Sequence, residues 1–143
     1  MQLNQATDYA FRAVLHLALA GTGQVVEAQS IAREQSIPMR FLLKIMRSLV
    51  RGGIVRSYRG VGGGFALARP AQEITLLDVV QAMEGPIRVN RCLVDPRYCS
   101  RHWSQHCPVH QALGQVQSAL AQALASHTFA DLALGVRAGP TRG

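Results

Sequence analysis

The feature that most constrains the fold of this chain is a pair of stripes that runs through residues 38–51. Four apolar residues recur there with steps of three, one and three: Leu42, Ile45, Met46 and Leu49. Four basic residues recur with steps of four, three and four: Arg40, Lys44, Arg47 and Arg51. At about 3.6 residues per turn the two stripes occupy different faces of one α-helix. The segment is therefore predicted to be a helix that buries one face and presents cations on the other.

The segments before this helix complete a second pattern. Apolar residues at helical spacing predict a first helix over about residues 5–20. A short second helix is expected over residues 27–35, and Ser36 and Ile37 connect it tightly to Pro38. Proline suits the first position of a helix, because its missing N–H has no partner there in any case. Two helices joined by a short turn, the second of them basic, are typical of a helix-turn-helix.

A glycine-dense segment follows the basic helix. Two β-prone runs, residues 54–58 and 65–68, flank residues 59–64, which read Arg-Gly-Val-Gly-Gly-Gly. This pattern predicts a hairpin, since glycine allows positive φ and a close approach of the backbone to another surface. A basic hairpin directly after a basic helix is expected to be a wing. Arg59 at its tip would enter the minor groove of DNA, where the negative potential is concentrated.

The charge of the chain is uneven along the sequence. Fifteen Lys and Arg residues against eight Asp and Glu residues give a formal net charge of +7. No acidic residue occurs between Gln35 and Gln72, and that stretch holds seven basic residues: Arg40, Lys44, Arg47, Arg51, Arg56, Arg59 and Arg69. A block of one sign in a well-patterned segment indicates a surface that binds phosphate groups. The alternative is a solvated basic face without a partner.

Two further helices are predicted in the rest of the chain. Thr75 and Asp78 form a capping box at the start of a helix that Gly85 and Pro86 end. A longer helix starts near Pro108 and carries a seam of apolar residues with steps of four and three: Val109, Leu113, Val116, Leu120 and Ala123. Such a seam suits pairing with a second copy of the chain, and the alternative is packing on the chain's own core.

The cysteines lie together in the sequence, in the pattern Cys92-x6-Cys99-x7-Cys107-x2-His110. Thiolates bind soft or borderline metals and iron–sulfur clusters, and His110 could reach the same centre. The spacing leaves three interpretations open, namely a cluster, a zinc ion held by three cysteines and a histidine, or free thiols that act as a redox switch. A disulfide framework is not expected, because the cysteine count is odd and nothing indicates secretion.

The sequence gives no support to an enzyme or a membrane protein. No Ser–His–Asp pattern, no Gly-Lys-Ser/Thr loop and no pair of carboxylates occurs, so catalysis is not expected. No run of about 18 apolar residues occurs, so no membrane span is expected. The chain is predicted to be cytoplasmic.

These segments divide the chain into four predicted parts. A winged helix-turn-helix domain for DNA binding covers residues 1–85, and the cysteine-bearing loop covers residues 86–108. The dimerisation helix and a C-terminal segment cover residues 109–135, and a tail over residues 136–143 is expected to be disordered. The expected fold class is mostly α with a small β-hairpin wing, a winged helix-turn-helix followed by a long C-terminal helix.

Five stretches before the cysteines match a known pattern: residues 37–42, 53–57, 59–68, 74–76 and 82–85. With the cysteines they resemble the Rrf2 family of bacterial transcription regulators, and the resemblance covers about residues 1–135. The most specific part is Arg-Gly-x-Gly-Gly-Gly followed by an aromatic residue. The resemblance implies a homodimer with one winged helix-turn-helix per subunit, joined through the long C-terminal helices.

The resemblance also implies a cofactor and its ligands. Cys92, Cys99 and Cys107 would hold an iron–sulfur cluster, of the 4Fe-4S or the 2Fe-2S type. Some members of the family take the fourth ligand from a histidine three positions after the third cysteine, which matches His110. Others take it from an acidic residue in the first helix of the partner subunit, which matches Asp8. The spacing between the cysteines is wider here than is usual in the family, and zinc stays the alternative cofactor.

The expected function is that of a DNA-binding regulator, a repressor, that recognises a palindromic operator. An iron–sulfur cluster that senses nitric oxide, redox state or iron would control its binding, and the alternative is a zinc-stabilised or thiol-redox regulator without a cluster. Arg40, Lys44 and Arg47 would approach the major groove, while Arg51 and Arg56 would contact phosphates. The expected DNA-binding residues are Pro38, Arg40, Phe41, Lys44, Arg47, Arg56, Arg59, Gly60 and Gly62.

Overall fold

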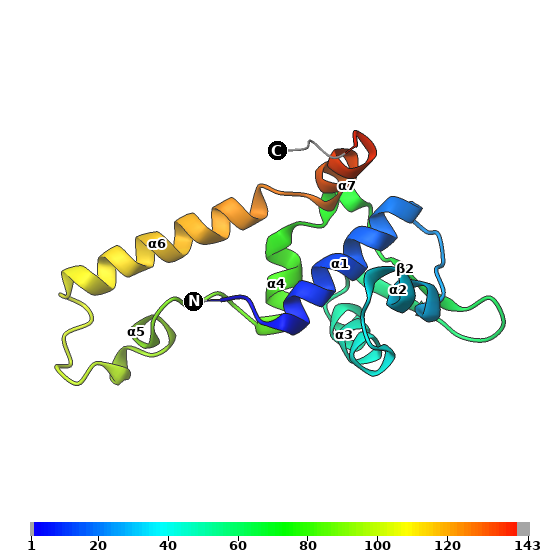
Figure 1. Ribbon diagram of the computed structural model, residues 1–143. Helices are drawn as coiled ribbons and strands as arrows, with labels where there is room; N and C mark the ends of the chain where they lie inside the picture. The colour runs from blue at the N-terminus through cyan, green and yellow to red at the C-terminus, as the bar shows by residue number, and fades with distance from the viewer. Residues whose placement is uncertain (1, 140–143) are drawn as a thin grey trace.

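The computed structural model describes residues 2–139 and is mostly helical, with one two-stranded antiparallel sheet (Figure 1). The predicted fold class is confirmed. In chain order the elements are α1 (Gln5–Ala20), α2 (Ala28–Gln35), α3 (Met39–Arg51), β1 (Val55–Tyr58), β2 (Gly64–Leu67), a 3₁₀ turn (Ala71–Glu73), α4 (Leu76–Glu84), α5 (Arg91–Val94), a second 3₁₀ turn (Pro96–Tyr98), α6 (Pro108–Ala125) and α7 (Phe129–Arg137).

The hydrophobic core lies where α1 packs against α3, α4 and α7. Helix α1 buries one face completely, including Ala13, Val14 and Leu17. Helix α3 contributes the predicted apolar stripe, in which all four residues are buried: Leu42, Ile45, Met46 and Leu49. This packing fixes the orientation of α3, so that its basic stripe faces solvent.

The turn between α2 and α3 is held by local and tertiary hydrogen bonds. Ser36 adopts the left-handed conformation with φ of 55°, and the N–H of Ile37 donates to the carbonyl oxygen of Ala32 at 2.9 Å. Arg12 of α1 donates from Nη1 to the carbonyl oxygen of Gln35 at 3.0 Å. Pro38 is the N-cap of α3 rather than its first helical residue, because its ψ of 135° is extended.

The predicted hairpin is present, with Val55 opposite Leu67 and Tyr58 opposite Gly64. We call residues 55–67 the wing. Its tip turns through Gly60 and Gly62, whose φ values of 88° and 76° are positive. A backbone bridge between Val26 and Phe65, with N–O distances of 2.8 and 2.9 Å, joins the wing to the segment before α2.

Helices α4 and α7 are joined at their starts. The capping box of Thr75 and Asp78 is present as predicted. The N–H of Leu76 donates to the carbonyl oxygen of His127, and the N–H of Phe129 donates to that of Ile74. The prediction of a disordered tail over residues 136–143 is wrong at its start, because residues 136 and 137 belong to α7. Residues 140–143 of that tail lie outside the described residues.

Helix α6 runs away from the helical core as an arm, with α5 beside its far end (Figure 1). Its 18 residues include no Asp, Glu, Lys or Arg. None of them is buried against the described part of the chain. Of the predicted seam, Val109 and Val116 are 63% and 54% exposed. No helix within residues 2–139 is both long and apolar enough to span a membrane.

Candidate DNA-binding face and cysteine loop

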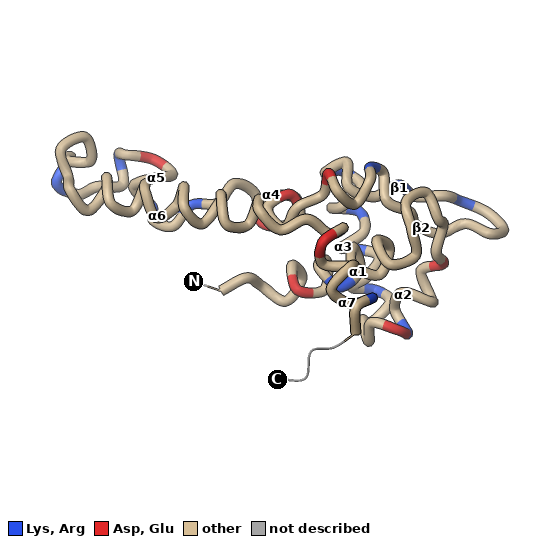
Figure 2. The backbone as a smooth tube through the Cα atoms, turned by 90° about the horizontal axis from the view of Figure 1, so that it is seen from above, with Lys and Arg blue, Asp and Glu red and all other residues tan. Residues whose placement is uncertain are grey.

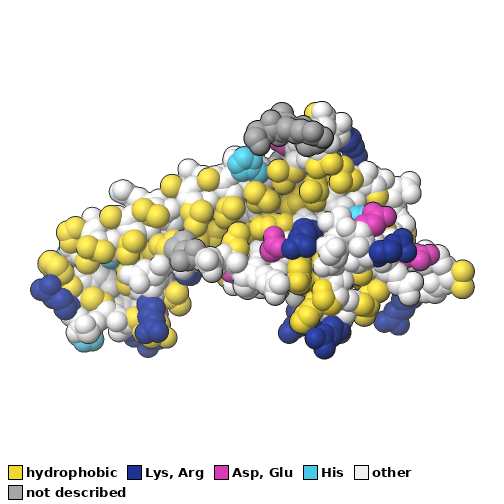
Figure 3. Space-filling model, viewed as in Figure 1, with side chains coloured by type: hydrophobic (Ala, Val, Ile, Leu, Met, Phe, Trp, Pro, Cys, Tyr) yellow, Lys and Arg dark blue, Asp and Glu magenta, His cyan; other side chains and the backbone are white. Residues whose placement is uncertain are grey.

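The basic stripe of α3 lies on solvent, opposite the buried stripe. All four of its side chains are exposed: Arg40, Lys44, Arg47 and Arg51. None of the eight acidic residues of the chain lies in α3 or the wing, and Figure 2 shows acidic positions only on other segments. In Figure 3 several basic side chains lie along the lower edge of the helical part of the molecule, and others lie on the arm and on the face toward the viewer. The face therefore carries uncompensated positive charge.

The start of α3 carries an aromatic residue together with its first arginine. The guanidinium of Arg40 lies over the ring of Phe41, at 4.9 Å from the ring centroid. Both side chains and Pro38 are exposed. A cation held on an aromatic face loses less rotamer freedom when it binds a ligand, because its geometry is already restricted.

The wing presents its predicted residues beside α3. Arg56 and Arg59 are exposed, the first on β1 and the second at the tip. A side chain could be added at Gly60 or Gly62 without meeting another atom within 4 Å, so their positive φ, not crowding, explains the glycines. Gly63 is different, because a Cβ there would overlap the carbonyl oxygens of Tyr58 and Gly60.

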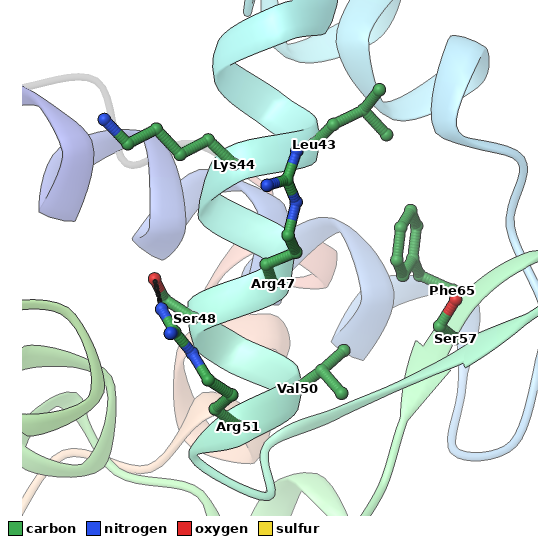
Figure 4. Close-up of a pocket in the computed structure, with 8 residues that line it drawn as sticks. All are labelled: Leu43, Lys44, Arg47, Ser48, Val50, Arg51, Ser57 and Phe65. Atoms are coloured by element: carbon green, nitrogen blue, oxygen red, sulfur yellow. Dashed lines mark hydrogen bonds between the residues drawn. The ribbon is translucent and has the colours of Figure 1, made fainter.

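A groove of about 660 Å³ separates α3 from the wing (Figure 4). Eight residues line it: Leu43, Lys44, Arg47, Ser48, Val50, Arg51, Ser57 and Phe65. Figure 4 shows Leu43 and Val50 projecting from the side of α3 that faces Phe65, while Lys44 and Arg51 project on the other side. Leu43, Val50 and the partly buried Phe65 were not predicted as groove residues. On the helical wheel, Leu43 and Val50 flank the basic stripe, and this position could have identified them.

The cysteine loop brings together two of its four predicted ligands. His110 Nδ1, in the first turn of α6, lies 3.0 Å from Cys92 Sγ in α5. The side-chain amide of Asn90 donates to the same sulfur at 3.6 Å. Cys92, Cys99 and Cys107 are all free thiols and all partly buried. A thiol paired with an imidazole is a ligand pair that zinc and iron–sulfur clusters both accept.

The other predicted ligands lie apart from this pair. Among residues 2–139 no group of three or more Cys, His, Asp or Glu side chains is close enough to hold a metal ion. The pKa of Cys99 is lowered, first by the backbone N–H of Trp103 and then by that of Arg101. Asp8 pairs with Arg12 in its own chain at 2.7 Å. The donor types fit a cluster or zinc, whereas their arrangement in a single chain does not form the site.

Comparison with known proteins identifies the family. Residues 3–134 match the model of the Rrf2 family, described as an iron-dependent transcriptional regulator. A candidate HTH-type transcriptional regulator from Aquifex aeolicus is 31% identical over 132 residues, which cover 92% of this chain and 91% of that protein. One from Mycobacterium tuberculosis is 41% identical over 87 residues, which cover 61% of this chain. The matched segment spans 54% of that relative, about half of its length.

Two solved structures share the fold. The IscR of T. potens superposes with a TM-score of 0.76 at 23% identity, covering 100% of this chain and 94% of that one. CymR, the global cysteine regulator of B. subtilis, superposes with a TM-score of 0.73 at 23% identity, covering 93% and 96%. The family and the matched relatives are described as transcriptional regulators, which agrees with the prediction that this chain is a regulator and not an enzyme. The basic helix, the glycine wing and the match over residues 3–134 show that the chain belongs to the Rrf2 family of transcriptional regulators.

Proposed function

We propose that the protein is a homodimeric repressor that binds a palindromic DNA operator in the cytoplasm. The observation that carries this proposal is the exposed basic stripe of α3 beside the wing, in a stretch of the chain without acidic residues. Arg40, Lys44 and Arg47 enter the major groove, where arginine can donate to guanine edges. Arg59 enters the minor groove, and Arg51 and Arg56 bind phosphates.

The proposal of a dimer rests on the solvent exposure of α6 in a single chain. This 18-residue helix has no Asp, Glu, Lys or Arg and no fully buried residue, and its seam is only partly covered by its own chain. Val109, Val116 and Ala123 are exposed, while Leu113 and Leu120 are partly buried. Such a helix is stabilised when the seam packs against a second copy. Pairing through α6 places the two copies of α3 about one DNA turn apart, which matches a palindromic operator.

The cysteine loop is proposed as the sensor of the regulator. Cys92, Cys99, Cys107 and His110 would hold an iron–sulfur cluster, with Asp8 of the partner subunit as the alternative fourth ligand. The cluster, when bound, supplies chemistry that responds to nitric oxide, oxygen or iron supply. The chain contributes the Cys92–His110 contact and a loop between α4 and α6 that connects the ligands to the DNA-binding half.

A second candidate is a zinc-stabilised or thiol-redox regulator without a cluster. The single-chain arrangement, in which Cys99 and Cys107 lie apart from the Cys92–His110 pair, favours the thiol-redox form of this candidate, because a zinc site would need the same ligands together. Purification without air, followed by a visible spectrum and by iron, sulfide and zinc analysis, separates the two candidates. Asp8→Ala and His110→Ala variants then identify the fourth ligand by loss of bound metal. A colourless protein that holds zinc would contradict the cluster.

DNA binding is tested with duplexes selected from a random pool by the full-length protein. Neutralising Arg40, Lys44 and Arg59 together should abolish retention of these duplexes at physiological salt. A triple variant of exposed arginines elsewhere, Arg91, Arg97 and Arg101, serves as the control for net charge. Unchanged retention by the first variant would contradict the proposal. Equal operator affinities of metal-loaded and metal-free protein under argon would contradict the sensor role alone.

A further inference from the structure

Three apolar side chains interrupt the charged surface between α3 and the wing. Leu43 is 40% exposed and Val50 is 38% exposed, and both project toward Phe65 of β2 (Figure 4). They line the same groove as Lys44, Arg47 and Arg51. A single exposed leucine is ordinary, but three apolar side chains gathered in one groove indicate a contact surface.

The position of Leu43 on α3 sets what it can reach. It lies three residues after Arg40 and four before Arg47, so it occupies the same side of the helix, one turn from each arginine. Leu43 is also the fifth residue of the 13-residue helix, near the end that enters the major groove in a helix-turn-helix. Val50 lies almost two turns farther on, toward the end that leaves the groove.

The charge around the groove indicates which class of ligand it binds. Three cations line it, and no acidic side chain is present in α3 or the wing, which favours a polyanion over an apolar peptide. Within DNA, the base edges of the major groove offer one apolar group, the 5-methyl group of thymine. An exposed leucine between two arginines therefore complements a thymine methyl group next to bases that arginine reads.

We propose that Leu43 is a specificity-determining residue, which selects thymine in each half-site of the operator through contact with its methyl group. This inference rests on the proposed DNA-binding function and adds to it a residue and a base. Arg51 supplies affinity for any duplex, and Lys44 and Arg47 contact bases of the major groove, whereas Leu43 adds a preference for thymine over cytosine at one position.

The test replaces thymine by deoxyuridine in a duplex that the full-length protein has selected from a random pool. This change removes the methyl group and keeps the Watson–Crick hydrogen bonds. The wild-type protein should bind the deoxyuridine duplex about threefold to fivefold more weakly for each contacted thymine. Leu43→Ala should bind the two duplexes equally. Leu134→Ala, which shortens an exposed leucine of α7, should keep the wild-type ratio.

The outcomes separate the inference from the function on which it rests. If no duplex is enriched from the pool, the proposed function is wrong and the inference falls with it. If duplexes are bound but wild-type protein does not distinguish thymine from deoxyuridine, the inference is wrong and DNA binding stands. If Leu43→Ala still binds the thymine duplex more tightly than the deoxyuridine duplex, by the wild-type ratio, another residue contacts the methyl group and the role of Leu43 is overturned. Unchanged thermal unfolding of Leu43→Ala shows that the variant is folded.

Discussion

Thr7 Oγ1 donates a hydrogen bond to Glu84 Oε2 at 2.5 Å, which joins the first turn of α1 to the last residue of α4. The two residues are 77 positions apart in the sequence, and Thr7 is fully buried. Because Glu84 directly precedes the segment that leads to the cysteine loop, this contact anchors the base of the loop to the core helix of the DNA-binding half.

Removing this hydrogen bond should destabilise the fold. Thr7→Val keeps the volume of the side chain and deletes the hydroxyl donor, which costs about 1.5 to 3 kcal/mol for a hydrogen bond to a charged acceptor. Urea denaturation should show a lower midpoint with an unchanged slope. Thr22→Val, in the exposed connection after α1, should stay within about 0.5 kcal/mol of the wild type. Equal losses in both variants would contradict a role for the contact.

Two substitutions of glycine by alanine should change the stability of the fold in opposite directions. A Cβ at Gly64 would overlap the carbonyl group of Val26, so Gly64→Ala should break the bridge to the wing and cost about 2 to 3 kcal/mol. Gly135 lies in α7 with no atom within 4 Å of an added Cβ, so Gly135→Ala should gain about 0.5 kcal/mol. Thermal unfolding of the two variants measures both effects, and a Gly64→Ala variant as stable as the wild type would refute the crowding at Gly64.

Basic residues that contact phosphates and basic residues that contact bases should differ in how they affect the salt dependence of DNA binding. Arg56→Ala should weaken binding to every duplex and lower the slope of log K against log salt by about 0.9 for each phosphate that the variant no longer neutralises. Arg47→Ala should relax the sequence preference in a renewed selection instead. Fluorescence anisotropy over a range of salt concentrations measures the slope. Arg137→Ala, at the end of α7, is the control and should leave the slope unchanged.

The exposed seam of α6 should control the oligomeric state. Val116→Glu introduces a charge at the centre of the proposed interface, where burial without a partner is costly. Sedimentation equilibrium at micromolar concentration should show a monomer, and operator binding should fall because one half-site is contacted at a time. Gln24→Glu, in the exposed connection after α1, should stay dimeric. A dimeric Val116→Glu variant would place the interface elsewhere.

The elements with strong local signals were predictable from the sequence. Helices α1 and α3 start and end within a residue or two of the predicted bounds, and α6 starts at the predicted Pro108, since periodicity and flanking glycine or proline determine these positions. Helix α7 was missed as a separate element. Its core residues Phe129 and Ala133 are buried by contact with α1, a long-range relationship that local pattern does not contain.

The two parts of the candidate site differ in how far the sequence reveals them. Helical periodicity alone puts the cations of α3 on one face, so that part was predictable. The groove was not, because the position of Leu43 opposite Phe65 depends on how the wing packs beside α3, which it contacts through β1. The arrangement of Cys99 and Cys107 depends on a loop with only short helices, where no periodic pattern fixes side-chain direction.

The uncharged surface of α6 has a consequence for how the regulator dissociates. Ions screen the attraction between arginines and phosphates, but they do not weaken contacts between valine, leucine and alanine side chains. In the proposed dimer, rising ionic strength should therefore release the operator long before it separates the subunits. The protein would leave DNA as an intact pair, ready to bind again without a second-order assembly step.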